Sequence, residues 1–315
     1  MAYSLTGKLV ALIGGSGFFG SHVAQELLAR GARLRLGSRH PEQAYRLRPL
    51  ANLGQIQFVR CDIRDAKSMA AMLAGADAAV NLVGAFSGNL DAIQGSGAGR
   101  VAAIAADAGC TSFVHVSAIG ADAQSSLAYQ RSKGHGEQAV RETFANATIL
   151  RPSILFGEED NFLNMFGRLI ARLPMLPVFA PQAPLQPLYV DDAAQAVVAA
   201  LEDPYRHGGR TYEIAGPERV TMMELNRRIA DAQARERHFL PLSDGMGRTI
   251  ASLSGWLPGV PISSDQYAML AQGNVISGDH PGLEALGITP RPMTLFLDRW
   301  MTRYRRYGRF TESEA

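Results

Sequence analysis

The sequence predicts an α/β fold, in which a doubly wound parallel sheet precedes a smaller, mostly helical C-terminal lobe. Short apolar segments alternate with helical patterns in the first half, as is typical of parallel strands buried on both faces. Beyond Phe156 this alternation loosens and prolines interrupt the connections. The expected strands of the first half span residues 8–14, 33–37, 57–61, 78–83, 112–117 and 147–150.

Helical patterns fill the intervals between these strands, and weaker ones continue to the end of the chain. The expected helices of the first half span 21–30, 66–73 behind the N-cap candidate Asp65, and 129–144. The second half is expected to hold a strand and helix over 189–201, a strand at 209–216, a helix at 222–234, and short helices over 249–271 broken by Pro258 and Pro261. We therefore expect a nucleotide-binding domain over 1–155 that also receives 184–216. A substrate-side or partner-docking lobe would span 156–183 and 217–315.

Composition excludes several classes of protein. The 315 residues are 47% hydrophobic, enough for a large core, and the net charge of +2 gives no indication of a nucleic-acid partner. Cys61 and Cys110 belong to no CxxC motif, which argues against a disulfide framework or a metal site and favours a reducing compartment. The first strand begins within about ten residues of Met1, and no apolar run reaches the roughly 20 residues of a membrane span. We expect a cytoplasmic protein without a transmembrane segment.

The first strand runs into a glycine-rich turn and then a helix. Gly14 permits the tight turn, Gly17 lets backbone N–H groups approach a pyrophosphate, and Gly20 lets the helix pack closely against the strand. The phosphates would then lie at the positive end of the helix. A glycine turn of purely structural use is the alternative.

The second strand indicates which dinucleotide binds. An NAD site carries an acidic residue about twenty positions beyond the glycines, whereas this chain has Ser38 and Arg39 there. Arginine forms forked hydrogen bonds with phosphate, so the pattern predicts NADP(H). The alternative is a solvated arginine that follows a strand.

Further candidates follow the other strands, because the carboxyl ends of parallel strands share one edge of a sheet. Asp62 and Ile63 are expected to meet the adenine, or Asp62 serves as a cap or turn residue. Asn81 either meets the ligand or satisfies buried backbone groups. The candidate cofactor residues are Gly14, Ser16, Gly17, Phe18, Phe19, Gly20, Ser38, Arg39, Asp62, Ile63, Asn81, Val83, Gly84, Tyr129, Lys133, Pro152 and Ser153.

A candidate catalytic set follows the fifth strand. Tyr129 and Lys133 are four residues apart at the start of a helix and so share one face. A nearby ammonium favours the phenolate and can donate to ribose hydroxyls, while Ser117 could orient a substrate carbonyl. His115 and His135 are better explained as a packed and an exposed histidine.

Together with the glycine loop and the YxxxK spacing, longer strings identify a family. They are 48–50 (RPL) with 52–55 (NLGQ), 129–133 (YQRSK), 156–164 (FGEEDNFLN), 186–191 (QPLYVD) and 282–288 (GLEALGI). The chain resembles the extended, atypical short-chain dehydrogenases/reductases, which have a Rossmann fold. Within them it is similar to the nucleotide-binding accessory subunits of the alpha subcomplex of respiratory complex I, subunit nine, and their bacterial relatives.

This resemblance implies a bound NADPH with a mainly structural role. It also implies partners among the peripheral-arm subunits of a complex I type NADH:quinone oxidoreductase, on the cytoplasmic face of a bacterial inner membrane. Because Ser117, Tyr129 and Lys133 are all present, a free-standing NADPH-dependent reductase or epimerase with a small-molecule substrate is the alternative. A nucleotide-sensing regulator is a third possibility.

Two surfaces have both a functional and a structural interpretation. The cations and aromatic residues of 299–309 suit an anionic lipid surface, but an amphipathic helix with Trp300 and Tyr304 packed inward explains them as well. The apolar residues Phe162, Met165, Phe166, Leu169, Ile170 and Leu173 have helical spacing and are more typical of core than of a quinone-facing wall.

Overall fold

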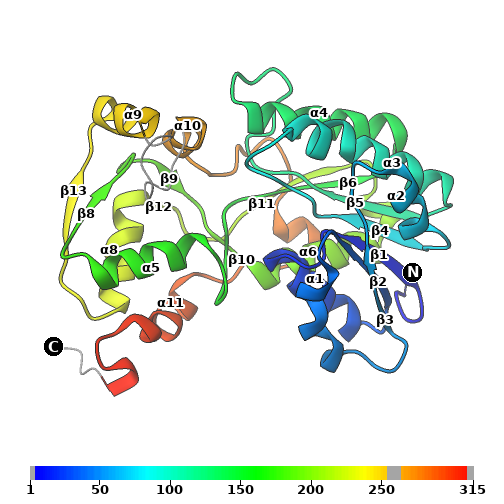
Figure 1. Ribbon diagram of the computed structural model, residues 1–315, viewed down its shortest axis with the longest axis horizontal. Coiled ribbons are helices and arrows are strands. Elements are labelled where there is room, and N and C mark those ends of the chain that lie inside the picture. The colour runs from blue at the N-terminus through cyan, green and yellow to red at the C-terminus, as the bar shows by residue number, and fades with distance from the viewer. Residues whose placement is uncertain (1–3, 254–263, 311–315) are drawn as a thin grey trace. The chain divides into compact units, whose positions relative to one another are not determined.

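The computed structural model describes residues 4–253 and 264–310 (Figure 1). Its chain forms two compact units. Unit 1 comprises Met1–Pro152, Val190–Ile214 and Ser277–Thr289, and unit 2 comprises Ser153–Tyr189, Ala215–Ile276 and Pro290–Ala315.

Unit 1 contains a seven-stranded parallel sheet with the order β11-β6-β5-β4-β1-β2-β3. Its strands are β1 (Leu9–Ile13), β2 (Arg33–Ser38), β3 (Ile56–Arg60), β4 (Ala78–Asn81), β5 (Ser112–Val116), β6 (Thr148–Pro152) and β11 (Thr211–Ile214). Strands β2 and β3 lie on one side of β1, and β4, β5 and β6 lie on the other, so the order in which strands are added reverses at β1, which carries the glycine loop. The prediction of a doubly wound parallel sheet is confirmed.

Helices cover both faces of this sheet (Figure 1). One face holds α1 (Phe18–Ala29) and α6 (Val190–Glu202), and the other holds α2 (Ala66–Leu73), α3 (Ser96–Asp107) and α4 (Ala128–Thr143). Short helical turns η1 (Pro41–Leu50), η2 (Asp91–Gly95), α7 (Pro204–His207) and η4 (Leu283–Leu286) complete the unit. Asp65 caps α2 as expected, because its carboxylate accepts the backbone N–H groups of Lys67 and Ser68.

Two glycines inside α4 explain how tightly its neighbours pack. A Cβ on Gly134 would lie 2.1 Å from Ala123 N, and one on Gly136 would lie 2.0 Å from Gln94 O. Neither position accepts a side chain. This explains why glycine, which is unfavourable in a helix interior, stands at both. Close packing, rather than ligand approach, is the reason for both.

The segment Ser277–Thr289 lies in unit 1, although the sequence groups it with the second lobe. Its anchor is Glu213 of β11, whose Oε2 accepts the backbone N–H of Ser277 at 2.6 Å and its hydroxyl at 2.8 Å. Glu213 N donates to Pro281 O at 3.1 Å. A carboxylate that is only 3% exposed needs such partners, and this return segment supplies them.

The described residues of unit 2 are mainly helical and form three two-stranded sheets. Its helices are α5 (Phe162–Arg172), α8 (Met222–Ala232), α9 (Asp244–Leu253), α10 (Ser264–Gln272), α11 (Thr294–Met301), η5 (Thr302–Tyr304) and η6 (Gly308–Phe310). Its sheets pair β7 (Leu155–Phe156) with β10 (Leu188–Tyr189), β9 (Pro184–Leu185) with β12 (Val220–Thr221), and β8 (Met175–Val178) with β13 (His238–Pro241). Pro258 and Pro261 lie outside the described residues. None of the helices described in either unit is both long and apolar enough to span a membrane.

The C-terminal aromatic residues of unit 2 pack inward. Trp300 is 9% exposed and stacks on Phe296 at 4.9 Å between ring centroids. The Tyr304 hydroxyl donates to Asn164 Oδ1 of α5 at 2.7 Å. The inward packing expected for Trp300 and Tyr304 is therefore present, although α11 ends at Met301 and short 3₁₀ turns follow it. Of the six apolar residues of 162–173 expected in the core, Ile170 is fully buried. Phe162, Met165, Phe166 and Leu169 are partly buried, and Leu173, just beyond α5, is 39% exposed, so the core interpretation holds only in part.

Candidate functional site

Two glycines of the loop after β1 are required by the backbone around them. Gly14 has a φ of +84°, and a Cβ there would lie 3.3 Å from both Leu82 C and Val83 N. A Cβ on Gly20 would lie 2.6 Å from the Cα of Gly15. The tight turn and the close approach of α1 both depend on these positions.

Gly17 is different, because packing does not explain it. Its φ of −75° suits any residue, and a Cβ there would meet only Gly14 O, at 3.7 Å. It is the N-cap of α1, and no side chain caps the first-turn N–H groups of that helix. Free N–H groups at a helix start, beside a position without a side chain, suit a bound phosphate.

A pocket of about 280 Å³, here called the strand-end pocket, opens at the carboxyl ends of β1 to β4. It brings together nine of the predicted cofactor residues: Gly14, Ser16, Gly17, Ser38, Arg39, Asp62, Ile63, Val83 and Gly84. Sequence reasoning did not select Ile13, Gly37, Cys61, Arg64, Leu82, Ala85 and Ile93, which also line it. Several of these residues directly precede or follow the predicted cofactor residues. Their position at strand ends is the sequence signal that could have identified them.

The rim of this pocket carries a hydroxyl pair and a cation. Ser38 Oγ lies 2.6 Å from Ser16 Oγ and accepts the backbone N–H of His40 at 3.1 Å. The exposed Arg39 forms no ion pair with any residue that the structure describes. A cation that forms no ion pair is available to an anionic ligand.

Asp62 is held in a turn by Arg64. Its Oδ1 accepts the backbone N–H and Nε of Arg64 at 2.9 and 3.0 Å, and its Oδ2 accepts Nη2 at 2.6 Å. These hydrogen bonds, with a smaller contribution from the Arg39 charge, lower the pKa of Asp62 to about 2. Asp62 therefore has the turn role that was expected as the alternative. Its ion pair with Arg64 also places Arg64 at the strand-end pocket.

The other predicted cofactor residues do not line this pocket. Phe18 packs edge-on against His22, and Gly20 packs against the loop. Asn81 is fully buried, where its Oδ1 accepts Val83 N at 3.1 Å and its Nδ2 contacts His115 Nδ1 at 3.2 Å. Phe19 lies in the first turn of α1, Pro152 ends β6, and the Ser153 hydroxyl donates to Gln186 O at 2.6 Å.

The three candidate catalytic residues lie on β5 and α4. Ser117 follows β5 and is 3% exposed, and its buried hydroxyl has no hydrogen-bond partner among the residues that the structure describes. Lys133 Nζ donates to Val116 O at 3.1 Å, and a Cβ placed on Gly84 would lie 3.5 Å from that nitrogen. Lys133 therefore reaches the end of β4, where Gly84 lines the pocket. The ring of Tyr129 stacks on Phe86.

Burial dominates the electrostatics of these groups. It lowers the pKa of Lys133 to about 8, against a smaller raising effect of Glu137. It raises the pKa of Tyr129 to about 12. Burial, with the nearby Lys133 charge, lowers the pKa of His115 to about 3, so this histidine is neutral and packed as expected. His135 lies 3.5 Å from Asp91 on the surface, and no group of metal-ligating side chains occurs among the described residues.

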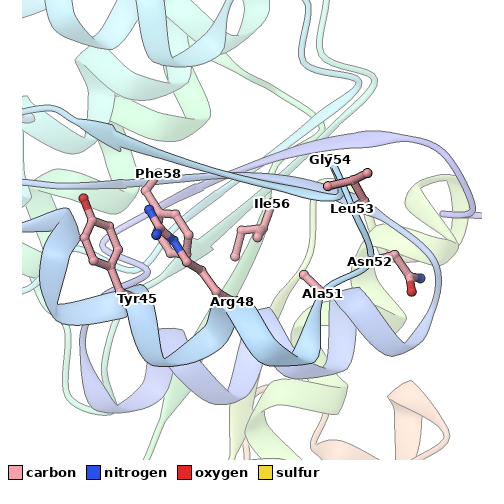
Figure 2. Close-up of a pocket in the computed structure, with 8 residues that line it drawn as sticks. All are labelled: Tyr45, Arg48, Ala51, Asn52, Leu53, Gly54, Ile56 and Phe58. Atoms are coloured by element: carbon pink, nitrogen blue, oxygen red, sulfur yellow. The ribbon is translucent and has the colours of Figure 1, made fainter.

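A second hollow of unit 1, here called the surface pocket, is larger. It measures about 480 Å³ and lies between η1 and β3, where Tyr45, Arg48, Leu53 and Phe58 line it (Figure 2). The Arg48 guanidinium lies 4.1 Å from the Tyr45 ring centroid and 5.5 Å from that of Phe58. Its lining comes from η1, from the loop 51–54 and from Ile56 and Phe58 of β3.

Comparisons with known proteins agree with this architecture. An NAD(P)H-binding family model matches residues 14–165, and a model described as an RmlD substrate binding domain matches residues 121–253. The structure of Citrobacter sp. triphenylmethane reductase complexed with NADP(H) superposes with a TM-score of 0.72, at 16% identity over 94% of this chain and 99% of that one. Unit 1 therefore has a Rossmann-like NAD(P)H-binding fold.

Several relatives match almost the whole chain, and two of them are described next. The protein named NADH dehydrogenase (ubiquinone) 1 alpha subcomplex subunit 9, mitochondrial, from Mus musculus is 31% identical over 99% of this chain and 84% of its own length. Its Dictyostelium discoideum counterpart is 30% identical over 98% of this chain and 88% of its own. The similarity thus extends through both units.

Proposed function

The chain belongs to the family of alpha subcomplex subunit 9 of NADH dehydrogenase (ubiquinone) 1, and we propose that it is an NADP(H)-binding accessory subunit of a complex I type NADH:quinone oxidoreductase. In this proposal the cofactor mainly stabilises the fold. The observation that carries the assignment is sequence identity of 30 to 31% over nearly the full length, whereas the triphenylmethane reductase, which covers 94% of the chain, is only 16% identical.

The strand-end pocket supports NADP(H) as the ligand. The first-turn N–H groups of α1 would hold the pyrophosphate, Gly17 would leave room for it, and Arg39 with Ser38 would bind the 2′-phosphate. No carboxylate ends β2 to accept hydrogen bonds from a ribose 2′-OH. When bound, the nicotinamide would supply or accept hydride.

A structural role for the nucleotide is energetically reasonable. A ligand present at 100 times its Kd adds about 2.7 kcal/mol to the free energy of unfolding. Partner subunits are expected to bind unit 2 and to hold the protein peripherally at a membrane, on its cytoplasmic face if the chain is bacterial.

Purification from native membranes tests this proposal. The tagged full-length chain is extracted in mild detergent, and the eluate is assayed for NADH:quinone reductase activity and for complex I subunits by mass spectrometry. Recovery with such an assembly supports the proposal. Recovery only as a free protein from both the soluble and the membrane fraction would refute it.

One observation favours a second function, an NADPH-dependent carbonyl reductase or epimerase. The buried Ser117 hydroxyl has no partner in the described part of the chain, as expected of a donor to a substrate carbonyl. In reduction, hydride from NADPH would add to the carbonyl carbon, Tyr129 would give its hydroxyl proton to the oxygen, and an alcohol and NADP⁺ would form. Lys133 would orient the ribose and refill the proton on Tyr129.

Tyr129→Phe distinguishes the two functions. A reductase would lose its turnover while its NADPH affinity stayed the same. In an accessory subunit with a structural cofactor, the substitution would change neither assembly nor affinity.

A further inference from the structure

An exposed phenylalanine lies against the candidate catalytic tyrosine. Phe86, in the loop between β4 and η2, is 66% exposed, yet its ring stacks on that of Tyr129 with 4.7 Å between centroids and 12° between planes. A large apolar side chain in a loop gains little from burial when two thirds of it faces water. Its position is better explained by what it covers.

A buried glutamine fixes this loop to α4. Gln94, in the π-helical turn η2, is 0% exposed. Its Oε1 accepts the backbone N–H of Ala85 at 3.0 Å, and its Nε2 donates to Ser132 Oγ at 2.8 Å. Insertions of this kind into helices are common at functional sites.

The connection continues to the tyrosine itself. Ser132 Oγ donates to the backbone carbonyl of Tyr129 at 2.9 Å. The absence of a side chain on Gly136 lets η2 lie against α4, because a Cβ there would be 2.0 Å from Gln94 O. Gln94 therefore ties the residue that precedes Phe86 to the helical turn that carries Tyr129, which holds the two rings in register.

We propose that Phe86 is a specificity-determining cover over Tyr129, which restricts the molecules that reach the tyrosine hydroxyl, and that Gln94 is the residue that positions it. The stacking of Phe86 on Tyr129 is a property of the cofactor-free chain. Only the biological role of this cover rests on the proposed nucleotide-binding function. It accounts for a complete Ser117, Tyr129 and Lys133 set beside a cofactor that is mainly structural. Molecules too large to pass the edge of the stacked rings would not reach the set.

The burial of Tyr129 agrees with this role. Tyr129 is half-buried with one face of its ring against Phe86, and desolvation raises the pKa of its hydroxyl to about 12. The Lys133 ammonium donates to Val116 O at 3.1 Å. Removal of the Phe86 ring is therefore expected to admit water and small reagents to Tyr129.

Nitration by tetranitromethane, quantified for each tyrosine by peptide mass spectrometry on the full-length chain, tests the cover. In Phe86→Ala, nitration of Tyr129 is expected to rise at least fivefold over the unmodified sequence, and Phe86→Tyr should restore the protected level. Tyr205, which is 95% exposed, serves as the internal reference in every sample. Leu53→Ala, which removes another exposed apolar side chain of unit 1, should leave Tyr129 protected.

Ser132→Ala tests the positioning role of Gln94, because it removes the acceptor of Gln94 Nε2. We expect a smaller increase than in Phe86→Ala, about twofold. Unchanged protection of Tyr129 in Phe86→Ala would overturn the cover, and unchanged protection in Ser132→Ala would overturn the positioning role of Gln94. A parallel NADPH titration separates these outcomes from the proposed function, because failure to bind NADPH leaves the nitration result intact.

Discussion

The strand-end pocket and the surface pocket lie in the same unit, and the smaller of the two has the features of a binding site. The surface pocket is larger, at about 480 against 280 Å³. Its groups already have partners within the protein: Arg48 stacks on Tyr45, and Gln55 fixes the adjoining turn through Asn52 N, Leu28 O and Ala32 O. Volume alone therefore does not identify the site.

The strand-end pocket presents groups that the protein leaves unsatisfied. Helix α1 starts without a side-chain cap, Gly17 has room for a Cβ, and Arg39 has no ion pair among the described residues. Without a ligand, each of these features either lowers the stability of the fold or adds nothing to it. A bound ligand would supply partners for these unused donors and this charge. Their presence distinguishes the strand-end pocket from the surface pocket.

Lys133→Met tests the buried cation beside Gly84, at the edge of the strand-end pocket. The folded-state pKa of Lys133 is about 8 against an ordinary value of 10.5, so the unfolded chain binds more protons between these pH values. The free energy of unfolding of the unmodified chain should thus rise, relative to Lys133→Met, by about 3 kcal/mol from pH 8 to 10.5. Urea denaturation across this range measures it, with Arg48→Met as the control. A difference that stays flat would contradict the burial of the charge.

Gly17→Ala tests the phosphate cradle. The new Cβ meets only Gly14 O at 3.7 Å, so the fold should lose less than about 1 kcal/mol. NADPH affinity should fall about 100-fold, or about 2.8 kcal/mol, because the side chain occupies the path of the pyrophosphate. The matched control is Gly245→Ala, where a Cβ also finds open space. Equal NADPH affinities for the two variants in calorimetric titration would exclude this cradle.

Arg39→Ala and Arg48→Ala form a matched pair, since both arginines are exposed and each belongs to a different pocket. Loss of a charge-assisted bond costs about 2 kcal/mol, so Arg39→Ala should weaken NADPH binding about 30-fold. NADH binding should change little, because NADH lacks the 2′-phosphate. Arg48→Ala should alter neither affinity, and an equal effect of both substitutions would point to nonspecific charge attraction.

The smallest expected effect concerns the surface pocket itself. Arg48→Ala removes the cation over the Tyr45 ring and should lower the free energy of unfolding by about 0.5 to 1 kcal/mol. Thermal denaturation of the cofactor-free chain measures this loss. No loss at all would indicate that the stacked arginine is not a structural element.

The strands and the glycine loop could be predicted from sequence because their signals are local. Apolar runs of strand length are bounded by turn residues, and Gly14 and Gly20 have the spacing that the turn demands. Arg39 was found in the same way, as the first charged residue after β2.

Other parts depend on contacts between distant segments. The pairing of β11 with β6 and the return of Ser277 to Glu213 join residues far apart in the chain, and no short window encodes them. The same holds for Gln94, whose role arises from a π-helical turn and from Ser132 on another helix. The missing partner of Ser117 Oγ is visible only once the surrounding atoms are placed.

Hydrogen–deuterium exchange of the full-length chain with and without NADPH tests the central claim most directly, namely that the strand-end pocket is the NADP(H) site. We predict slower exchange in peptides that cover residues 14–20 and 82–85, a weaker effect with NADH at equal concentration, and no change over residues 51–58 of the surface pocket. Protection confined to residues 51–58, or stronger protection by NADH, would contradict the account.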